Sequence, residues 1–448
     1  MFCASTSRLR LFCLSLALMN GGPGLGHCLA PSEAGPVAAG GRISIAGPGQ
    51  CQFCHAQQAE VRLSSPTVGL AFDVHARQGL GCADCHGGDP LATERDRAHT
   101  AAAGFVGRPD PAAIPVLCAR CHSNPAFMVT YNPGLPVDQW EKYKTSRHGQ
   151  LLEMGVLKVA QCVSCHTAHN VRPAHDPESS VSPANIPRTC AHCHGDSKYM
   201  AGFGIPTDQF DKYRASVHGV ALLEKGNLGA PACNGCHGNH GAVPPGVQSL
   251  AHVCGVCHAI NRDMFEKSPH AKVFAIQEIA PCTVCHGYHG ITPPTARTFD
   301  MEADSVCVTC HVQDDAGWKA GKAMYGQVTE LLELRTKAET LLDQAEMLGM
   351  DVSDGRFLMR DFRTSFFQLR TLSHELDLNA YAAKAKEARD QLTKAVQVAH
   401  AAIDEFYFRR KGLWVSLLLA IPLLLLLYLK VRALDVNRAA SGRPAPEE

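Results

Sequence analysis

The last third of the chain alternates apolar and polar residues with a helical period. Residues 312–411 contain no cysteine and are rich in Ala, Leu, Glu, Lys and Gln, and their apolar positions recur every three or four residues. The pattern breaks at residues 349–355 and 377–379, so it predicts helices over about 315–348, 355–375 and 379–429. Such apolar stripes are more typical of a bundle core than of a partner site, and residues 312–411 are therefore predicted to form a helical stalk.

The end of the third predicted helix is apolar on every face. Residues 412–429 carry no charge, and at about 1.5 Å per residue this stretch is about 27 Å long, which is enough to cross a hydrocarbon core. Trp414 and Tyr428 lie near its two ends, as interfacial anchors do. The pattern predicts a single transmembrane helix that continues from the stalk, with residues 430–448 as a cytoplasmic tail.

The N-terminus has the layout of an export signal. Arg8 and Arg10 precede the apolar run 11–19, and small residues follow at 21–26. Residues 1–30 are predicted to be a signal peptide and residues 31–50 a linker. A lipid anchor at Cys28 is disfavoured because His27 stands where a small residue is required. With the C-terminal anchor, this predicts an inner-membrane protein whose main domain lies in the periplasm.

Residues 51–311 differ from both ends. Gly and Pro are frequent, as in residues 132–136 and 243–246, which favours loops and short helices with little β-sheet. The predicted fold class is therefore mainly α and irregular, followed by a helical hairpin or bundle stalk and a C-terminal transmembrane helix.

One motif, Cys-x-x-Cys-His, occurs nine times in this region and uses 18 of the 21 cysteines. Two thiols at this spacing can form thioethers to both vinyl groups of one haem, and the adjoining histidine then reaches the iron as its proximal ligand. Zinc knuckles and redox dithiols do not require that histidine. The motifs predict nine haem c groups, attached through Cys51, Cys54, His55, Cys82, Cys85, His86, Cys118, Cys121, His122, Cys162, Cys165, His166, Cys190, Cys193, His194, Cys233, Cys236, His237, Cys254, Cys257, His258, Cys282, Cys285, His286, Cys307, Cys310 and His311.

An internal repeat organises these motifs. Residues 138–149 and 208–219 are copies of one element, Tyr-x-x-Ser-x-His-Gly, and a looser copy ends at His270. Each copy precedes a Cys-x-x-Cys-His-x-x-His motif and then a plainer motif. This predicts dihaem units at about 138–194, 208–258 and 262–311, and a degenerate first unit at about 75–122.

Each unit supplies two motifs and two further histidines, which predicts iron coordination by two histidines. The predicted distal ligands are His75, His99, His148, His169, His218, His240, His270 and His289. The sequence does not assign them to individual irons.

The Cys51 haem is left over in this scheme. Its sixth ligand could be His175, His192, His252, a methionine or water. His27, His374 and His400 are less favoured, the first because it could be cleaved and the others because they lie on helices beyond the haem region. An open iron would permit ligand binding and catalysis.

With its attachment motifs, its Cys-x-x-Cys-His-x-x-His variant and its Tyr-x-x-Ser-x-His-Gly element, region 51–311 resembles membrane-anchored multihaem c-type cytochromes of the doubled-motif kind. This resemblance implies periplasmic electron transfer between a membrane quinol-oxidation system and soluble or outer-membrane carriers. The quinol-dehydrogenase cytochromes of nitrate and nitrite respiration have an N-terminal anchor, so the resemblance does not extend to direct quinol oxidation.

Three hypotheses follow. The leading one is an electron carrier without catalytic residues, which links an integral-membrane redox partner to a periplasmic or outer-membrane acceptor. The second is a reductase of a small nitrogen or sulfur oxyanion at an open Cys51 haem. The third is an electron-transfer or structural subunit of a larger membrane respiratory complex.

Charge removes one class of partner. The chain has 42 basic and 42 acidic residues, and no basic footprint for nucleic acid is visible in it. Haem propionates would make the loaded protein acidic.

Overall fold

The structure, a computed structural model, describes residues 49–246, 249–302 and 305–440. The predicted signal peptide, most of the predicted linker and the end of the predicted tail lie outside the described residues.

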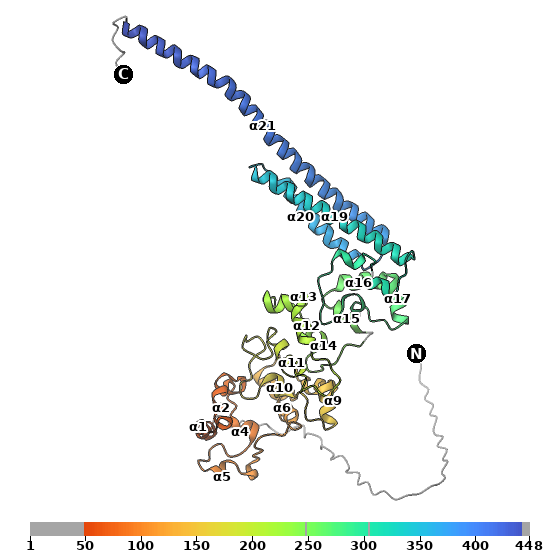
Figure 1. The fold of residues 1–448 in the computed structure, drawn as a ribbon. Helices are drawn as coiled ribbons and strands as arrows, with labels where there is room; N and C mark the ends of the chain where they lie inside the picture. Colours follow the sequence, from red (N-terminus) through yellow and green to blue (C-terminus); the bar gives the residue numbers. More distant parts are fainter. Residues whose placement is uncertain (1–48, 247–248, 303–304, 441–448) are drawn as a thin grey trace, which may run out of the picture. The chain divides into compact units, whose positions relative to one another are not determined.

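Between residues 50 and 311 the described chain forms short helices joined by loops, and no strand is assigned in it (Figure 1). The helices are α1 (Gln50–Ala56), α2 (Val61–Gly69), α3 (Val74–Arg77), α4 (Cys82–His86), α5 (Arg95–Ala98), α6 (Ile114–His122), α7 (Pro125–Tyr131), α8 (Gln139–Thr145), α9 (Arg147–Glu153), α10 (Cys162–His166), α11 (Ile186–His194), α12 (Gln209–Ala215), α13 (Val217–Gly219), α14 (Cys233–His237), α15 (Leu250–Gly255), α16 (Ala259–Lys267), α17 (Pro269–Ile276) and α18 (Thr283–His286). Short 3-10 or π turns are η1 (Leu70–Phe72), η2 (Ala101–Ala103), η3 (Val220–Glu224), η5 (Ala296–Phe299) and η6 (Val306–Thr309). The predicted fold class, mainly helical and irregular, is confirmed.

Three long helices follow. They are α19 (Ala316–Met347), α20 (Ser353–Leu372) and α21 (Leu378–Ala440), close to the predicted bounds, and α19 and α20 both pack against α21 (Figure 1). The chain reverses at residues 348–352 and again at 373–377. Because α20 returns along α19, the second turn lies at the same end of the bundle as the start of α19.

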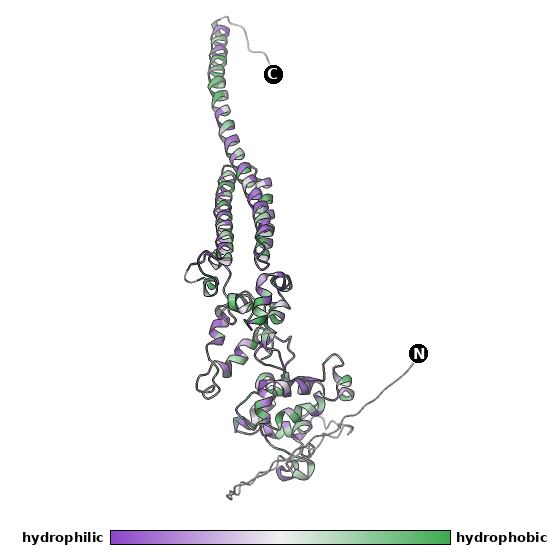
Figure 2. Ribbon diagram, turned by 90° about the vertical axis from the view of Figure 1, so that its right-hand side faces the viewer, coloured by the Kyte–Doolittle hydropathy of each residue, from purple (hydrophilic) through white to green (hydrophobic). Residues whose placement is uncertain are grey.

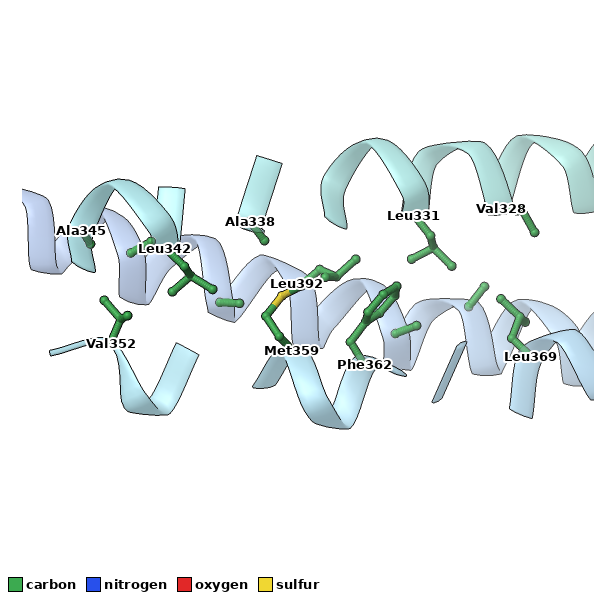
Figure 3. Packing of buried hydrophobic residues seen from close by; sticks show 14 of the residues in the cluster. Val328, Leu331, Ala338, Leu342, Ala345, Val352, Met359, Phe362, Leu369 and Leu392 are labelled. Carbon is green, nitrogen blue, oxygen red and sulfur yellow. The ribbon is translucent and has the colours of Figure 1, made fainter. Parts of the chain in front are cut away.

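A seven-residue repeat of apolar positions builds the bundle core. On α21 the fully buried positions are 385, 388, 392, 395 and 399, which alternate steps of three and four. Four of these are alanines, which let the helix backbones approach closely, and the larger Leu331, Leu342, Phe362 and Leu369 of α19 and α20 fill the space between them (Figure 3). This is the spacing of coiled-coil packing.

Polar contacts at the edges of this core fix the helix pairing. Arg389 of α21 donates two hydrogen bonds to the Glu330 carboxylate of α19, at 2.7 and 2.6 Å. Ser365 Oγ of α20 donates to Glu387 Oε1 of α21 at 3.0 Å. Each contact joins a different helix to α21, so side-chain register as well as apolar burial specifies the bundle.

The C-terminal part of α21 differs from the rest of the bundle. Among the described residues, α21 is the one helix long and apolar enough to cross a membrane, and its most apolar segment is not buried. Figure 2 shows hydrophobic residues gathered there. Pro422 lies inside the helix without ending it.

Truncating the bundle core should destabilise it. Leu392 is fully buried, so Leu392→Ala should lower the free energy of unfolding of the bundle by about 2–5 kcal/mol through lost burial and the cavity left behind. Urea unfolding followed by circular dichroism at 222 nm measures this change. Met347→Ala is the matched control, because Met347 is 81% exposed, and it should change stability by less than about 0.5 kcal/mol. Equal effects of the two substitutions would contradict the described core.

Candidate haem-binding sites

Helical geometry explains the spacing of the attachment motif. In α4, α10 and α14 the five motif residues make up the whole helix. The two cysteines are three residues apart and the histidine is four residues from the first cysteine, which puts all three side chains on one face of a helical turn. A single flat macrocycle on that face can meet both sulfurs and the imidazole.

Every proximal histidine faces a second histidine ring. The nine pairs have ring centroids 5.9–6.2 Å apart. A metal–imidazole bond is about 2 Å long, so two imidazoles bound to opposite sides of one metal have centroids about 6 Å apart. The pairs are His55 with His99, His122 with His75, His86 with His169, His194 with His148, His166 with His240, His258 with His218, His237 with His289, His311 with His270, and His286 with His374.

The space around these pairs also suits a macrocycle. One continuous cavity of 4590 Å³ is lined by residues of all nine motifs and by the facing histidines. Divided among nine motifs it gives 510 Å³ each, within the roughly 300–1,000 Å³ of cofactor sites. Among the described residues, no group of three or more His, Cys, Asp or Glu side chains is placed to hold a bare metal ion. Two histidines per site instead suit a metal whose other four ligands come from a porphyrin.

The repeat units share one pairing rule. In each unit, the histidine of the first element faces the proximal histidine of the plainer motif of the same unit. These pairs are His75 with His122, His148 with His194, His218 with His258 and His270 with His311.

The other histidine of each unit serves the preceding unit. His169, three residues after a proximal histidine, faces His86 of the unit before it, and His240 and His289 face His166 and His237 in the same way. His99 of the first unit faces His55, the motif that precedes all units. Consecutive units therefore interlock through their histidines.

A fixed set of hydrogen bonds orients the histidine of the first element. Tyr143 Oη donates to the Ala160 carbonyl, two residues before the Cys162 motif, and Ser146 Oγ accepts from the Gly149 N–H at 2.9 Å. A Cβ on Gly149 would lie 2.0 Å from the Tyr143 carbonyl oxygen, so this close approach requires glycine.

The next unit repeats these contacts. Tyr213 Oη donates to the Pro231 carbonyl, and Ser216 Oγ accepts from Gly219 N–H. The Tyr-x-x-Ser-x-His-Gly element thus positions one histidine, and the hydrogen bond of its tyrosine connects it to the residues just before the following motif.

Backbone hydrogen bonds reinforce the interlock. The residue before each presented histidine donates its N–H to the carbonyl two residues past the serving histidine of the next unit. These bonds run from Val74 to Val171, from Arg147 to Ala242 and from Val217 to Ile291, at 2.9–3.1 Å.

Seven of the eighteen facing rings have an acceptor at Nδ1, which would leave Nε2 for iron. His86 Nδ1 lies 2.7 Å from the Gly107 carbonyl oxygen, and His374 Nδ1 lies 3.0 Å from that of Thr371. Two rings have carboxylates instead: Asp73 lies 2.9 Å from His75 Nδ1 and Asp315 lies 3.2 Å from His311 Nδ1. Such contacts fix the tautomer and ring orientation of a metal-binding histidine.

Burial favours the neutral, metal-binding form of the imidazoles. Loss of solvation lowers the pKa of ten of the facing histidines: His122, His148, His166, His169, His194, His218, His240, His270, His286 and His289.

The motifs follow one another in space in chain order. The thiols of Cys118 and Cys162, from the third and fourth motifs, share a hydrogen bond that raises the pKa of Cys118. Burial raises the pKa of Cys85 to about 11, and the neighbouring Cys118 adds to this. Thiol hydrogen bonds also join two later pairs of consecutive motifs, through Cys190 and Cys233 and through Cys254 and Cys282. At the remaining steps burial raises the pKa of one cysteine and the nearby thiol of the next or preceding motif adds to it: Cys82 with Cys51, Cys165 with Cys193, Cys236 with Cys254, and Cys285 with Cys307.

Two features of this arrangement differ from the expectations from sequence. The partner of the Cys51 motif was left open among His175, His192, His252, a methionine and water, whereas its His55 faces His99, a histidine assigned to the first repeat unit. The partner from outside the haem region is His374, which faces His286, although a helical surface histidine was expected there. His374 lies just past the end of α20 rather than on a helix face. His175, His192, His252 and His400 face no other histidine ring within the described part of the chain, and His27 lies outside it.

Comparison with known proteins agrees with these motifs. Residues 74–195 match the cytochrome c3 family. Searches of curated proteins and of solved structures returned no match. Cytochrome c3 domains are extracytoplasmic and transfer electrons through c-type haems. Residues 74–195 of this mainly helical chain therefore form a cytochrome c3-like multihaem domain.

Proposed function

We propose that the chain binds nine haem c groups and conducts electrons along them, outside the inner membrane, between an integral-membrane redox partner and a periplasmic or outer-membrane acceptor. The observation that carries this proposal is the set of nine facing histidine pairs along one cavity. Each haem, when bound, carries one electron by alternating between Fe(III) and Fe(II). The side chains described above hold, orient and enclose it.

Filled axial positions support conduction rather than substrate chemistry. A reductase needs an iron with one open position, and the Cys51 haem was the candidate for it. The ring of His99 now stands 6.0 Å from that of His55, and His55 Nδ1 lies 3.3 Å from the Leu63 carbonyl oxygen. No catalytic residue is proposed.

The order of the motifs supports a single path. Each motif has a cysteine close enough to a cysteine of the next motif in the chain for one thiol to influence the other. An electron received at either end of this series would pass through the motifs in chain order.

The apolar part of α21 supports a membrane anchor. We propose that residues 412–429 cross the inner membrane and that the haem-binding residues lie on the periplasmic side, as for cytochrome c3 domains. One span cannot carry electrons across the bilayer, because residues 412–429 contain no histidine to hold a second cofactor there. This is why the proposal includes an integral-membrane redox partner, which makes the chain one component of a larger respiratory system.

The purified protein should contain nine haems, all low-spin. Two histidines at each iron leave no position for carbon monoxide, so the reduced protein should not bind it and its electron paramagnetic resonance spectrum should lack a high-spin signal. Pyridine haemochrome analysis gives the haem count. A high-spin signal from the native protein would favour the reductase instead.

Charge beside one histidine should lower the potential of its iron. In Asp315→Asn the carboxylate no longer accepts from His311 Nδ1, while asparagine can still cap α19. A charged hydrogen bond is stronger than a neutral one by roughly 1 kcal/mol, so the potential of that haem should rise by roughly 40 mV. Spectroelectrochemical titration measures the shift.

Asp390→Asn is the matched control for this measurement. Asp390 pairs with Lys386 on the exposed face of α21 and does not line the cavity, so its substitution should leave all potentials unchanged. An unchanged titration for Asp315→Asn would contradict tuning by the carboxylate.

Removing the apolar segment should release the protein. A chain that ends at Lys411 keeps α19, α20 and the buried part of α21, so it should be recovered in the soluble periplasmic fraction with its full haem content. The full chain should require detergent. Fractionation followed by haem staining measures both, and a membrane-bound truncated chain would contradict the anchor.

A further inference from the structure

We propose that His374, in the turn between α20 and α21, is the distal ligand of the haem attached at Cys282 and Cys285, so that the helical bundle completes the last repeat unit. This inference rests on the proposed function in one respect, namely that the facing pairs bind haem iron. It adds a metal ligand outside the region that contains the attachment motifs.

The pairing rule leaves one proximal histidine of the last repeat unit without a partner from a following unit. The first proximal histidine of each unit is served by the unit that follows it, as His237 is served by His289. The last unit contains His286 in this role, and no further unit follows. Past His311 the chain contains two histidines, His374 and His400, and the ring of His374 lies 6.1 Å from that of His286.

The last unit also lacks the backbone donor that the earlier ones use to bind a successor. Val74, Arg147 and Val217 donate their N–H groups to the next unit, and the equivalent residue before His270 is Pro269, which has no N–H. Ser268, equivalent to Ser146 and Ser216, is buried and its Oγ has no partner. The last unit therefore lacks the backbone contact by which the earlier units hold their successors, as expected of a terminal repeat.

The bundle brings His374 to this place by its topology. α19 runs away from the last motif and α20 returns, so the end of α20 lies beside the start of α19. The turn is held on both sides by core residues, since Leu369 before it and Tyr381 after it are almost fully buried. Asp377 caps α21 by accepting from the N–H groups of Asn379 and Ala380.

Orientation and surroundings suit an axial ligand. The His374 and His286 rings are inclined by 29°, within the 6–86° range of the other pairs, and Nδ1 of His374 is occupied by the Thr371 carbonyl. Phe366 and Leu376 line the same cavity and supply apolar surface for a porphyrin. Arg370 also lines the cavity and makes no ion pair with another described residue, so its guanidinium is available to a haem propionate.

The consequence is a bundle that takes part in the haem chain. Its α20–α21 turn would set the ligand field of the eighth iron, so a displacement of α20 against α21 would alter that iron's coordination directly. A spacer between haems and membrane would have no such effect.

The test replaces His374 in the full-length, haem-loaded protein. His374→Ala should keep nine haems but make one of them high-spin, and the reduced protein should bind about one carbon monoxide per chain where the unchanged protein binds none. Added imidazole should restore the low-spin spectrum. His374→Met provides a second readout with a ligand still present, and it should move one haem of nine to a higher potential.

Two further variants separate this inference from the proposed function. His400→Ala, an exposed position on α21, should leave all haems low-spin. His240→Ala removes a distal ligand within the repeats and should also open one iron. If His240→Ala opens an iron and His374→Ala does not, the inference is overturned and the proposed function stands. If neither does so with nine haems present, coordination by two histidines fails as a whole.

Circular dichroism at 222 nm distinguishes a lost ligand from a lost bundle. His374 is in a turn outside the apolar core, so His374→Ala should keep the helical signal of α19, α20 and α21. A high-spin haem together with a large loss of helicity, and no return of the low-spin spectrum with imidazole, would overturn the proposal.

Discussion

Facing imidazoles from different parts of the chain are the constraint on which the region between residues 50 and 311 depends. Its helices have three to nine residues, too few to be stable alone in water. Outside the bundle, the described residues form a buried apolar cluster only around Tyr213, Leu222 and Ala232. The cavity that runs past all nine motifs takes the place of a side-chain core. Haem groups bound in this cavity between the histidine pairs would therefore supply most of the stabilisation that buried side chains supply in other domains.

The bundle follows the opposite principle, and this decides what the sequence could predict. Its seven-residue apolar repeat is local, so the helix bounds and the core positions of α19 to α21 could be read from spacing alone. The attachment motifs were equally readable, because the chemistry of one turn of helix fixes Cys, Cys and His at set intervals. The eight histidines predicted as distal partners all face a proximal histidine.

The assignment of partners could not be read in the same way, because it depends on topology. His169 serves His86 across 83 residues of sequence, and no local pattern encodes that reach. With this pairing pattern known, two sequence features gain a meaning. Pro269 lacks the N–H that the earlier units donate to the following unit, and the hairpin of α19 and α20 returns the chain to the last unit at His374. The sequence placed His374 on a helix because the periodic pattern continued to about residue 375, whereas α20 ends at Leu372.

The length of α21 has a consequence for how electrons reach the chain. Residues 378–411 precede the apolar span, and 34 helical residues measure about 51 Å. With residues 412–429 embedded, the base of α21 would stand that far above the hydrocarbon core of the bilayer if the helix is upright. Electron tunnelling over such a distance is negligible. A lipid-soluble reductant within the bilayer could not reduce a haem beside the His374 turn directly, so its electron donor must extend from the bilayer to a similar height.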